Sequence, residues 1–168
     1  LWQDTLSLLL IDTESTRKLI INNFKGVRID GSNATIITRN GSFISDRNSI
    51  PRVWSDHGVW PYFALREYIH KNGDMNILLK EAAYFYDHQL KRAKEIDEKF
   101  AGKKNILKTK NGTIYKGSIL EHILIENLVQ FFNVGKHNIT RLENADWNDG
   151  LDMAAEFGES VTVSSMYA

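Results

Sequence analysis

The chain of 168 residues contains no cysteine, which excludes disulfides and thiolate metal sites. Lysine and arginine total 21, as do aspartate and glutamate, so bulk charge does not favour binding to nucleic acid or to a membrane surface. No apolar run reaches the roughly 20 residues that a membrane-spanning helix needs. Because the lack of cysteine fits a reducing compartment, we expect a cytoplasmic protein that binds neither nucleic acid nor membrane.

Proline is scarce as well, and the two prolines, Pro51 and Pro61, leave room for long helices. Residues 26–49 are rich in glycine, asparagine and serine, which predicts a long loop with one or two short strands. Residues 88–116 are basic and polar, which predicts an exposed insertion. Helical periodicity and capping residues predict helices over residues 3–10, 12–24, 60–71, 75–86, 92–100 and 119–134, and a last helix from about residue 159.

Two of these helices carry clear start signals. Asp12 is a candidate N-cap that separates the first two helices, and Ser118 with Glu121 forms a capping box. The helix after Ser118 is apolar on most sides, so we expect it to be deeply buried and to end at Gly135. The fold class is therefore mainly α, with antiparallel helix pairs and long functional loops. Periodicity alone leaves a bundle, a solenoid and a toroid open.

The segment ENADWNDGLD, residues 143–152, concentrates carboxylates and amides around one tryptophan. Asp146 and Asp149 flank Trp147 and Asn148, a set that suits carbohydrate chemistry because sugars stack on aromatic rings and their hydroxyls pair with carboxylates. A carboxylic acid desolvated against a ring can keep its proton near neutral pH and protonate a glycosidic oxygen. The alternative is an ordinary Asn-Asp-Gly turn. A calcium loop is less favoured, since the alternating ligands of an EF-hand are missing.

A second candidate site is the segment RVWSDHGVW, residues 52–60. Arg52, Asp56 and His57, together with two tryptophans, could hold a polar ligand at the end of the long loop. The alternative is a pair of core tryptophans beside a capping serine. The other histidines show no metal-ligand spacing, and His122 is expected to be a hydrogen-bonded core residue.

Taken together, the two segments resemble glycoside hydrolase family 94. ADWNDGLD followed by GESV resembles the catalytic segment of that family, and WSDHGVWPYFALREYIHKNGD resembles its Ser-Asp-Asp-x-x-Trp segment and the helix that follows. WQDTLSLLLIDTESTRKLI and SILEHILIENL resemble helices of its catalytic domain. The resemblance implies that residues 1–168 form one partial catalytic domain, part of an (α/α)6 barrel. We therefore expect a piece of a longer protein that exposes a large apolar surface and is inactive alone. The expected protein partner is the remainder of the parent chain or a second copy in a homo-oligomer.

The resemblance also implies roles for the site residues. Asp149 occupies the position of the general acid, and Asp146, Trp147 and Asn148 are candidate sugar contacts. Asp56 keeps the first aspartate of the Ser-Asp-Asp segment, whereas His57 replaces the second. Arg52 lies near the position of the family's donor-subsite arginine.

The family consists of inverting phosphorylases, such as cellobiose and chitobiose phosphorylases. The implied reaction is phosphorolysis of a β-linked glucan oligosaccharide or disaccharide, with inorganic phosphate as co-substrate and no cofactor or metal. The sequence looks most similar to the 1,2-β-oligoglucan phosphorylases, and the phosphate-site residues are expected outside this chain. An inverting β-glucan hydrolase of related fold and a non-catalytic sugar-binding piece are the alternatives.

Overall fold

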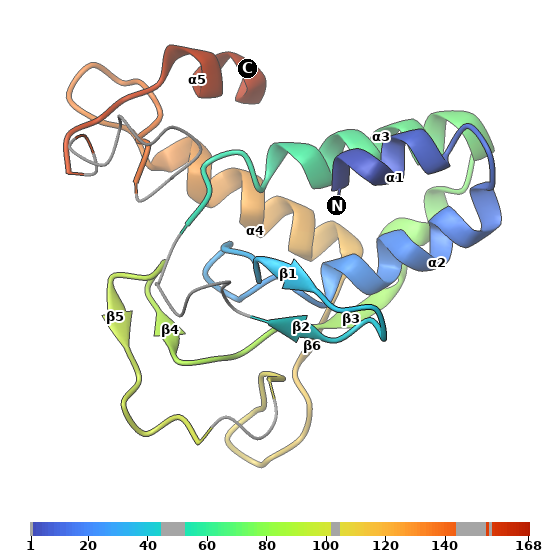
Figure 1. Ribbon diagram of the computed structural model, residues 1–168, viewed down its shortest axis with the longest axis horizontal. Coiled ribbons are helices and arrows are strands. Elements are labelled where there is room, and N and C mark those ends of the chain that lie inside the picture. The colour runs from blue at the N-terminus through green and yellow to red at the C-terminus, as the bar shows by residue number, and fades with distance from the viewer. Residues whose placement is uncertain (1, 45–52, 102–104, 144–153, 155) are drawn as a thin grey trace.

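The computed structural model describes residues 2–44, 53–101, 105–143, 154 and 156–168, and Figure 1 shows their arrangement. The described helices are α1 (Trp2–Leu8), α2 (Thr13–Phe24), α3 (Val59–Asn72), α4 (Ile119–Phe132) and α5 (Val161–Tyr167), with a 3-10 helix η1 (Met75–Leu79). The strands are β1 (Ile36–Ile37), β2 (Phe43–Ile44), β3 (Glu81–Ala83), β4 (Gln89–Leu90), β5 (Glu95–Ile96) and β6 (Lys116–Ser118). These elements confirm the mainly α class, while closure into an (α/α)6 barrel stays a prediction.

Helices α1 and α2 form a hairpin that packs against α3 (Figure 1). The Asp12 carboxylate accepts a hydrogen bond from Ser15 N at 3.0 Å and begins α2, which confirms the predicted N-cap. Pro61 lies in the first turn of α3, where the absent N–H costs nothing. The apolar faces of these helices enclose a core whose largest members include Trp2, Phe24 and Ile20.

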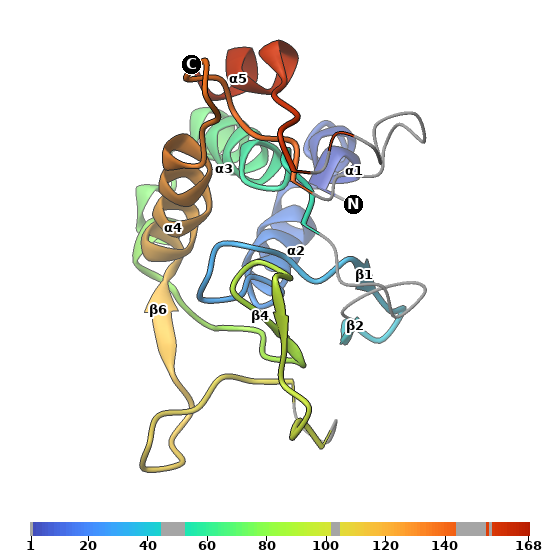
Figure 2. The same cartoon turned by 90° about the vertical axis from the view of Figure 1, so that its left-hand side faces the viewer.

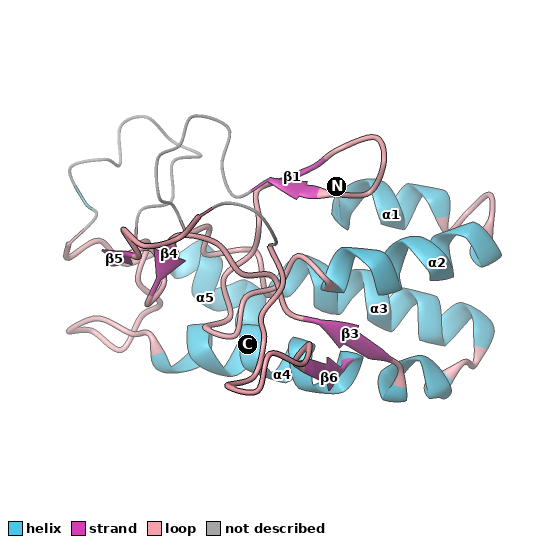
Figure 3. Cartoon of the chain, turned by 90° about the horizontal axis from the view of Figure 1, so that it is seen from below, coloured by secondary structure: helices cyan, strands magenta, loops and turns pink. Residues whose placement is uncertain are grey.

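The strands form three separate two-stranded antiparallel sheets among the described residues. β1 pairs with β2 within the predicted long loop, β3 pairs with β6, and β4 pairs with β5 in a hairpin. Seen from below, β4 and β5 lie away from the packed helices α1 to α3 (Figure 3). β6 leads directly into α4 (Figure 2), so the β3–β6 pairing fixes where α4 begins.

The helix predicted over residues 75–86 is wrong. Only the 3-10 helix η1 forms, and the chain then extends into β3, whose Ala82 is buried. Asp74 makes no side-chain cap, because its carboxylate instead accepts hydrogen bonds from Arg17 Nε at 2.7 Å and from Tyr68 Oη at 3.0 Å. Tertiary pairing with Arg17 and with β6 therefore overrides the local helix propensity.

The helix predicted over residues 92–100 is also wrong. This stretch begins in a turn that joins β4 to β5, and Lys91, Arg92 and Ala93 all have left-handed backbone with φ of 50°, 56° and 61°. The insertion is not wholly exposed either, since Gln89 is buried and Arg92 is partly buried.

Helix α4 begins as predicted, because Ser118 Oγ accepts a hydrogen bond from Glu121 N at 3.1 Å. It ends at Phe132, before the predicted Gly135. Its orientation contradicts the expected deep burial. The buried face carries three polar residues, His122, Glu126 and Gln130, besides Ile119 and Ile123. The exposed face carries the apolar stripe, which we define as Leu120, Leu124, Leu128, Phe131 and Phe132.

Helix α5 begins after Ser160, whose Oγ accepts a hydrogen bond from Val163 N at 3.2 Å, so the predicted last helix is confirmed. Within the described part of the chain, no helix has the length and apolar character needed to cross a membrane.

Candidate functional site

Residues 55–58 of the second candidate segment form a turn at the start of α3 that includes Asp56 and His57. Asp56 Oδ2 accepts a hydrogen bond from Trp60 Nε1 at 2.8 Å, which orients the carboxylate by a residue one helical turn away. Asp56 Oδ1 is buried and has no hydrogen-bond partner among the described residues. That oxygen is a candidate acceptor for a ligand hydroxyl, because buried carboxylate oxygens are normally hydrogen-bonded.

His57 lies beside Trp54, with the two rings stacked at 5.9 Å between centroids. Burial lowers the pKa of His57 to about 4, and the positive charges of Arg28 and Arg92 act in the same direction, while Asp56 opposes them. The imidazole is therefore neutral near pH 7. A neutral imidazole next to a carboxylate offers both a donor and an acceptor to a polyhydroxylated ligand.

Helices α4 and α5 hold this turn in place. Asn127 Nδ2 donates to Gly58 O at 3.2 Å, and Tyr167 Oη donates to Ser55 O at 2.8 Å. A Cβ on Gly58 would lie 2.8 Å from Tyr167 Oη and 3.0 Å from Glu126 O, so a side chain at this position would require Tyr167 and α4 to shift. The sequence therefore brings three distant segments together at the Asp56–His57 turn.

Glu126 lies under this turn on the buried face of α4. Its Oε1 accepts a hydrogen bond from the buried Asn33 Nδ2, whereas Oε2 has no partner among the residues described. Burial raises the pKa of Glu126 well above its ordinary value, against the opposing effects of Asn33 and Arg92. Glu126 thus favours the protonated, uncharged form.

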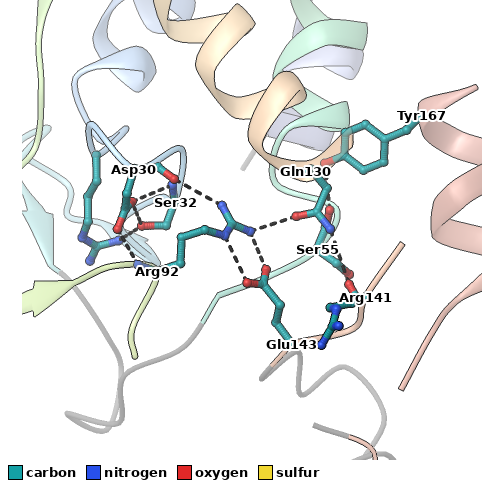
Figure 4. A network of polar contacts seen from close by, with 9 residues as sticks. Asp30, Ser32, Ser55, Arg92, Gln130, Arg141, Glu143 and Tyr167 are labelled. Carbon is teal, nitrogen blue, oxygen red and sulfur yellow. Dashed lines mark hydrogen bonds and ion pairs between the residues drawn. The ribbon is translucent and has the colours of Figure 1, made fainter. Parts of the chain in front are cut away.

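A network of polar contacts centred on Arg92 connects the β4–β5 turn to α4 and to Glu143 (Figure 4). Arg92 Nε lies 3.1 Å from Glu143 Oε1, and Nη2 contacts Glu143 Oε2, which makes a two-point ion pair. Arg92 Nη2 also donates to Gln130 Oε1 at 2.8 Å. Glu143 is the first residue of the first candidate segment, so this network lies at that segment's start.

The chain beyond the first candidate segment returns beside its beginning. Leu142 N donates to Gly158 O at 3.0 Å, and Arg141 Nη1 donates to Glu156 O at 3.3 Å. Ser160 N donates to Thr140 O at 2.9 Å. Residues 140–142 and 158–160 therefore lie antiparallel, joined by an isolated bridge between Arg141 and Glu159.

The structure places only part of the predicted site. Asp56 and His57 are brought together at the turn before α3. Five predicted site residues lie outside the described residues: Arg52, Asp146, Trp147, Asn148 and Asp149. Of the residues described, no group of three or more His, Asp or Glu side chains is placed to hold a metal ion.

Sequence reasoning missed Glu126, Gln130, Arg92 and Tyr167. A signal for the first two existed, because His122, Glu126 and Gln130 recur every four residues and so share one face of an otherwise apolar helix. Arg92 and Tyr167 reach the site only through tertiary contacts, for which the sequence holds no local pattern. His122 is a core histidine as expected, with Nδ1 2.8 Å from Ser118 O and its ring stacked on Tyr84.

Comparison with known protein families identifies the family to which the chain belongs. No significant match to a curated protein was found. A sequence model described as the glycosyl hydrolase 94 superfamily, catalytic domain, matches residues 1–168. The match spans the whole chain, both candidate segments included. The chain therefore belongs to the glycosyl hydrolase 94 superfamily, a family of enzymes that act on glycosides.

Proposed function

We propose that the chain is part of an inverting phosphorylase that converts β-linked glucosides and phosphate into α-glucose 1-phosphate. The substrate class is β-1,2-oligoglucan or a cellobiose-like disaccharide. The observation that carries the proposal is the family match across residues 1–168, a range that includes the Asp-Trp-Asn-Asp segment. Because that segment resembles the catalytic segment of the family, we assign Asp149 as the general acid. We further propose a cytoplasmic location, no cofactor besides phosphate, and no role for nucleic acid or membrane.

The reaction needs one protein acid. A phosphate oxygen attacks C1 from the face opposite the glycosidic bond, the bond from C1 to the glycosidic oxygen breaks, and Asp149 gives its proton to that oxygen. The configuration at C1 changes from β to α. An inverting hydrolase would instead need a second carboxylate to activate water.

The described turn supports the sugar-binding part of the proposal. The Asp56 carboxylate is oriented by Trp60, and its buried Oδ1 has no hydrogen-bond partner among the described residues. His57 is neutral near pH 7 because burial lowers its pKa to about 4. We assign Asp56, His57 and Arg52 to the donor sugar, together with Asp146, Trp147 and Asn148 of the first candidate segment.

The test uses the full-length protein supplied with α-glucose 1-phosphate and a panel of glucose and glucose disaccharides as acceptors, with sophorose and cellobiose included. Phosphate release with one acceptor would establish a phosphorylase and identify the linkage. Glucan cleavage that proceeds equally well without phosphate would point to the hydrolase alternative. Stoichiometric sugar binding without turnover would point to the non-catalytic one.

Asp149→Asn in the full-length enzyme is expected to lower phosphorolysis by at least about 100-fold, because general acid catalysis contributes about 10²–10⁴-fold. Folding should be unchanged, since the two side chains have nearly the same shape. Asp152→Asn, in the same segment, is the matched control and should retain turnover. Near-normal turnover by Asp149→Asn would remove Asp149 from the acid role.

Trp147→Ala is expected to weaken sugar binding as well as rate, because the indole would stack on the apolar face of the sugar. Calorimetric titration of the full-length variant with its best disaccharide measures the affinity directly. An unchanged affinity would make the indole a core residue.

A further inference from the structure

We propose that Arg92 is a positioning residue that fixes the start of the segment carrying the general acid. The inference rests on the proposed function, because it takes Asp149 as that acid. Arg92 acts through Glu143, which lies six residues before Asp149 in the chain. It belongs to the β4–β5 turn, which neither the family resemblance nor the predicted site includes.

The ion pair between Arg92 and Glu143 has the geometry of a fixed connection. Two guanidinium nitrogens meet the two carboxylate oxygens, so the pair resists rotation as well as separation. The two side chains are only 11% and 8% exposed, which limits screening by solvent and salt.

Arg92 is itself held from two further directions (Figure 4). Its backbone N donates to Asp30 Oδ2 at 2.6 Å, and the other oxygen of Asp30 is fixed by Ser32 Oγ at 2.6 Å. Gln130 of α4 accepts from Nη2 at 2.8 Å. Glu143 is therefore connected to a helix and to the loop before β1 through one arginine residue, by its guanidinium and its backbone N–H.

The backbone at both ends of the ion pair is left-handed, with φ of 56° at Arg92 and 53° at Glu143. Lys91 and Ala93 are left-handed too, with φ of 50° and 61°. Side-chain-bearing residues rarely adopt this conformation, and it persists where surrounding contacts over-determine it, often at functional sites. The strain on both sides of one ion pair marks it as a site where position is enforced.

Removing the ion pair should therefore displace Glu143 and, with it, the start of the segment. An error of about 1 Å in the placement of a catalytic group can cost about 100-fold in rate. The loss should appear in kcat. KM should rise as well, because Asp146, Trp147 and Asn148, which we assign to the donor sugar, belong to the same segment.

The test compares full-length Arg92→Ala, Arg92→Lys and Glu143→Gln with Lys91→Ala as the matched control. Lys91 occupies the same left-handed turn but is exposed and pairs with Glu95. We expect Arg92→Ala to lower kcat for the disaccharide by about 100-fold. Arg92→Lys should be intermediate, because lysine keeps the charge without the two-point geometry. Lys91→Ala should behave as wild type.

Two readouts separate positioning from a general structural role. A 2,4-dinitrophenyl β-glucoside has a leaving group that needs no proton, so its turnover should fall little in Arg92→Ala. In addition, the kcat losses of Arg92→Ala and Glu143→Gln should not multiply in the double variant, since both remove one contact. Equal losses on both substrates, or independent losses in the double variant, would overturn the proposal.

The phosphate dependence of wild-type turnover distinguishes a failure of the proposed phosphorolysis from a failure of the proposed role of Arg92. If its turnover needs no phosphate, phosphorolysis fails, but the ratio of variant to wild-type kcat still measures the positioning role on hydrolysis. If turnover needs phosphate and Arg92→Ala retains wild-type kcat, phosphorolysis stands and the role of Arg92 fails.

Discussion

At the residue scale, burial moves the pKa values of His57 and Glu126 in opposite directions, and both shifts favour the uncharged form. Desolvation lowers the pKa of His57 to about 4 and raises that of Glu126 well above its ordinary value. In the same turn, one oxygen of Asp56 is already paired with Trp60. A site that binds neutral sugars through hydroxyl groups gains from having few buried charges to compensate.

Glu126→Gln is predicted to raise stability at neutral pH. Because the folded pKa is raised, the folded state keeps the proton while the unfolded state loses it above about pH 4.5. Stability therefore falls as pH rises from that point, by about 1.4 kcal/mol per pH unit until the folded pKa is reached. Glutamine keeps the oxygen that Asn33 contacts and removes this dependence. Urea unfolding across pH 4–8 measures it, with exposed Glu98→Gln as control. An unchanged pH profile would show that Glu126 is ionised.

His57→Gln tests the opposite shift. A folded pKa of about 4 lies below the unfolded value of 6.5, so the unfolded state takes up the proton first as pH falls. The wild type should lose about 2 kcal/mol more than the variant between pH 7 and pH 5. Parallel profiles for the two proteins over this range would mean that the imidazole titrates normally in the fold. His70→Gln, on the last turn of α3, is the control.

At the scale of elements, the N-cap hydrogen bonds are the local interactions that stabilise the starts of α2 and α4. Ser118→Ala removes the oxygen that Glu121 N contacts and should destabilise the protein by about 1 kcal/mol. Ser118→Asp should retain the cap, because aspartate is an equally good acceptor and favours the helix dipole. Urea unfolding of the wild type and the two variants measures these differences in the free energy of unfolding. Equal stability of Ser118→Ala and wild type would show that β6, rather than the cap, sets the start of α4.

These caps also show how far the sequence could predict the elements. Asp12, Ser118 and Pro61 act within a few residues of themselves, so their helices could be predicted. The structures of residues 75–86 and 92–100 could not be predicted in this way. The Asp74 carboxylate pairs with Arg17 instead of capping a helix, and the left-handed turn at Arg92 depends on a contact with Asp30. Local propensity is a weak prior against such distant contacts.

The residues of the candidate site also differ in whether the sequence could predict them. Asp56 and His57 could be singled out because acidic, aromatic and imidazole side chains are adjacent in the sequence. Glu126 could have been found from its four-residue spacing with His122 and Gln130. Arg92 could not, since its partner Glu143 is distant in sequence and the turn that presents it resembles a solvated basic stretch.

At the scale of the whole molecule, the orientation of α4 determines which surface is exposed. Because polar residues fill its buried face, the apolar stripe faces outward, with Leu128 50% and Phe132 74% exposed. The expected exposure of apolar surface is thus found along one helix. Contiguous apolar patches of this kind favour association in water.

The chain of residues 1–168 is therefore predicted to self-associate through α4. The double variant Leu124→Glu with Leu128→Lys should reduce association, because it places charges in the middle of the stripe. The two new side chains are four residues apart in the favourable order, so the helix should not be weakened. Leu10→Glu with Ile11→Lys makes the same chemical change at the exposed turn after α1 and should leave association unchanged. Sedimentation velocity over a range of concentrations measures the effect. If both double variants lower association equally, general surface charge is the cause and the stripe has no particular role.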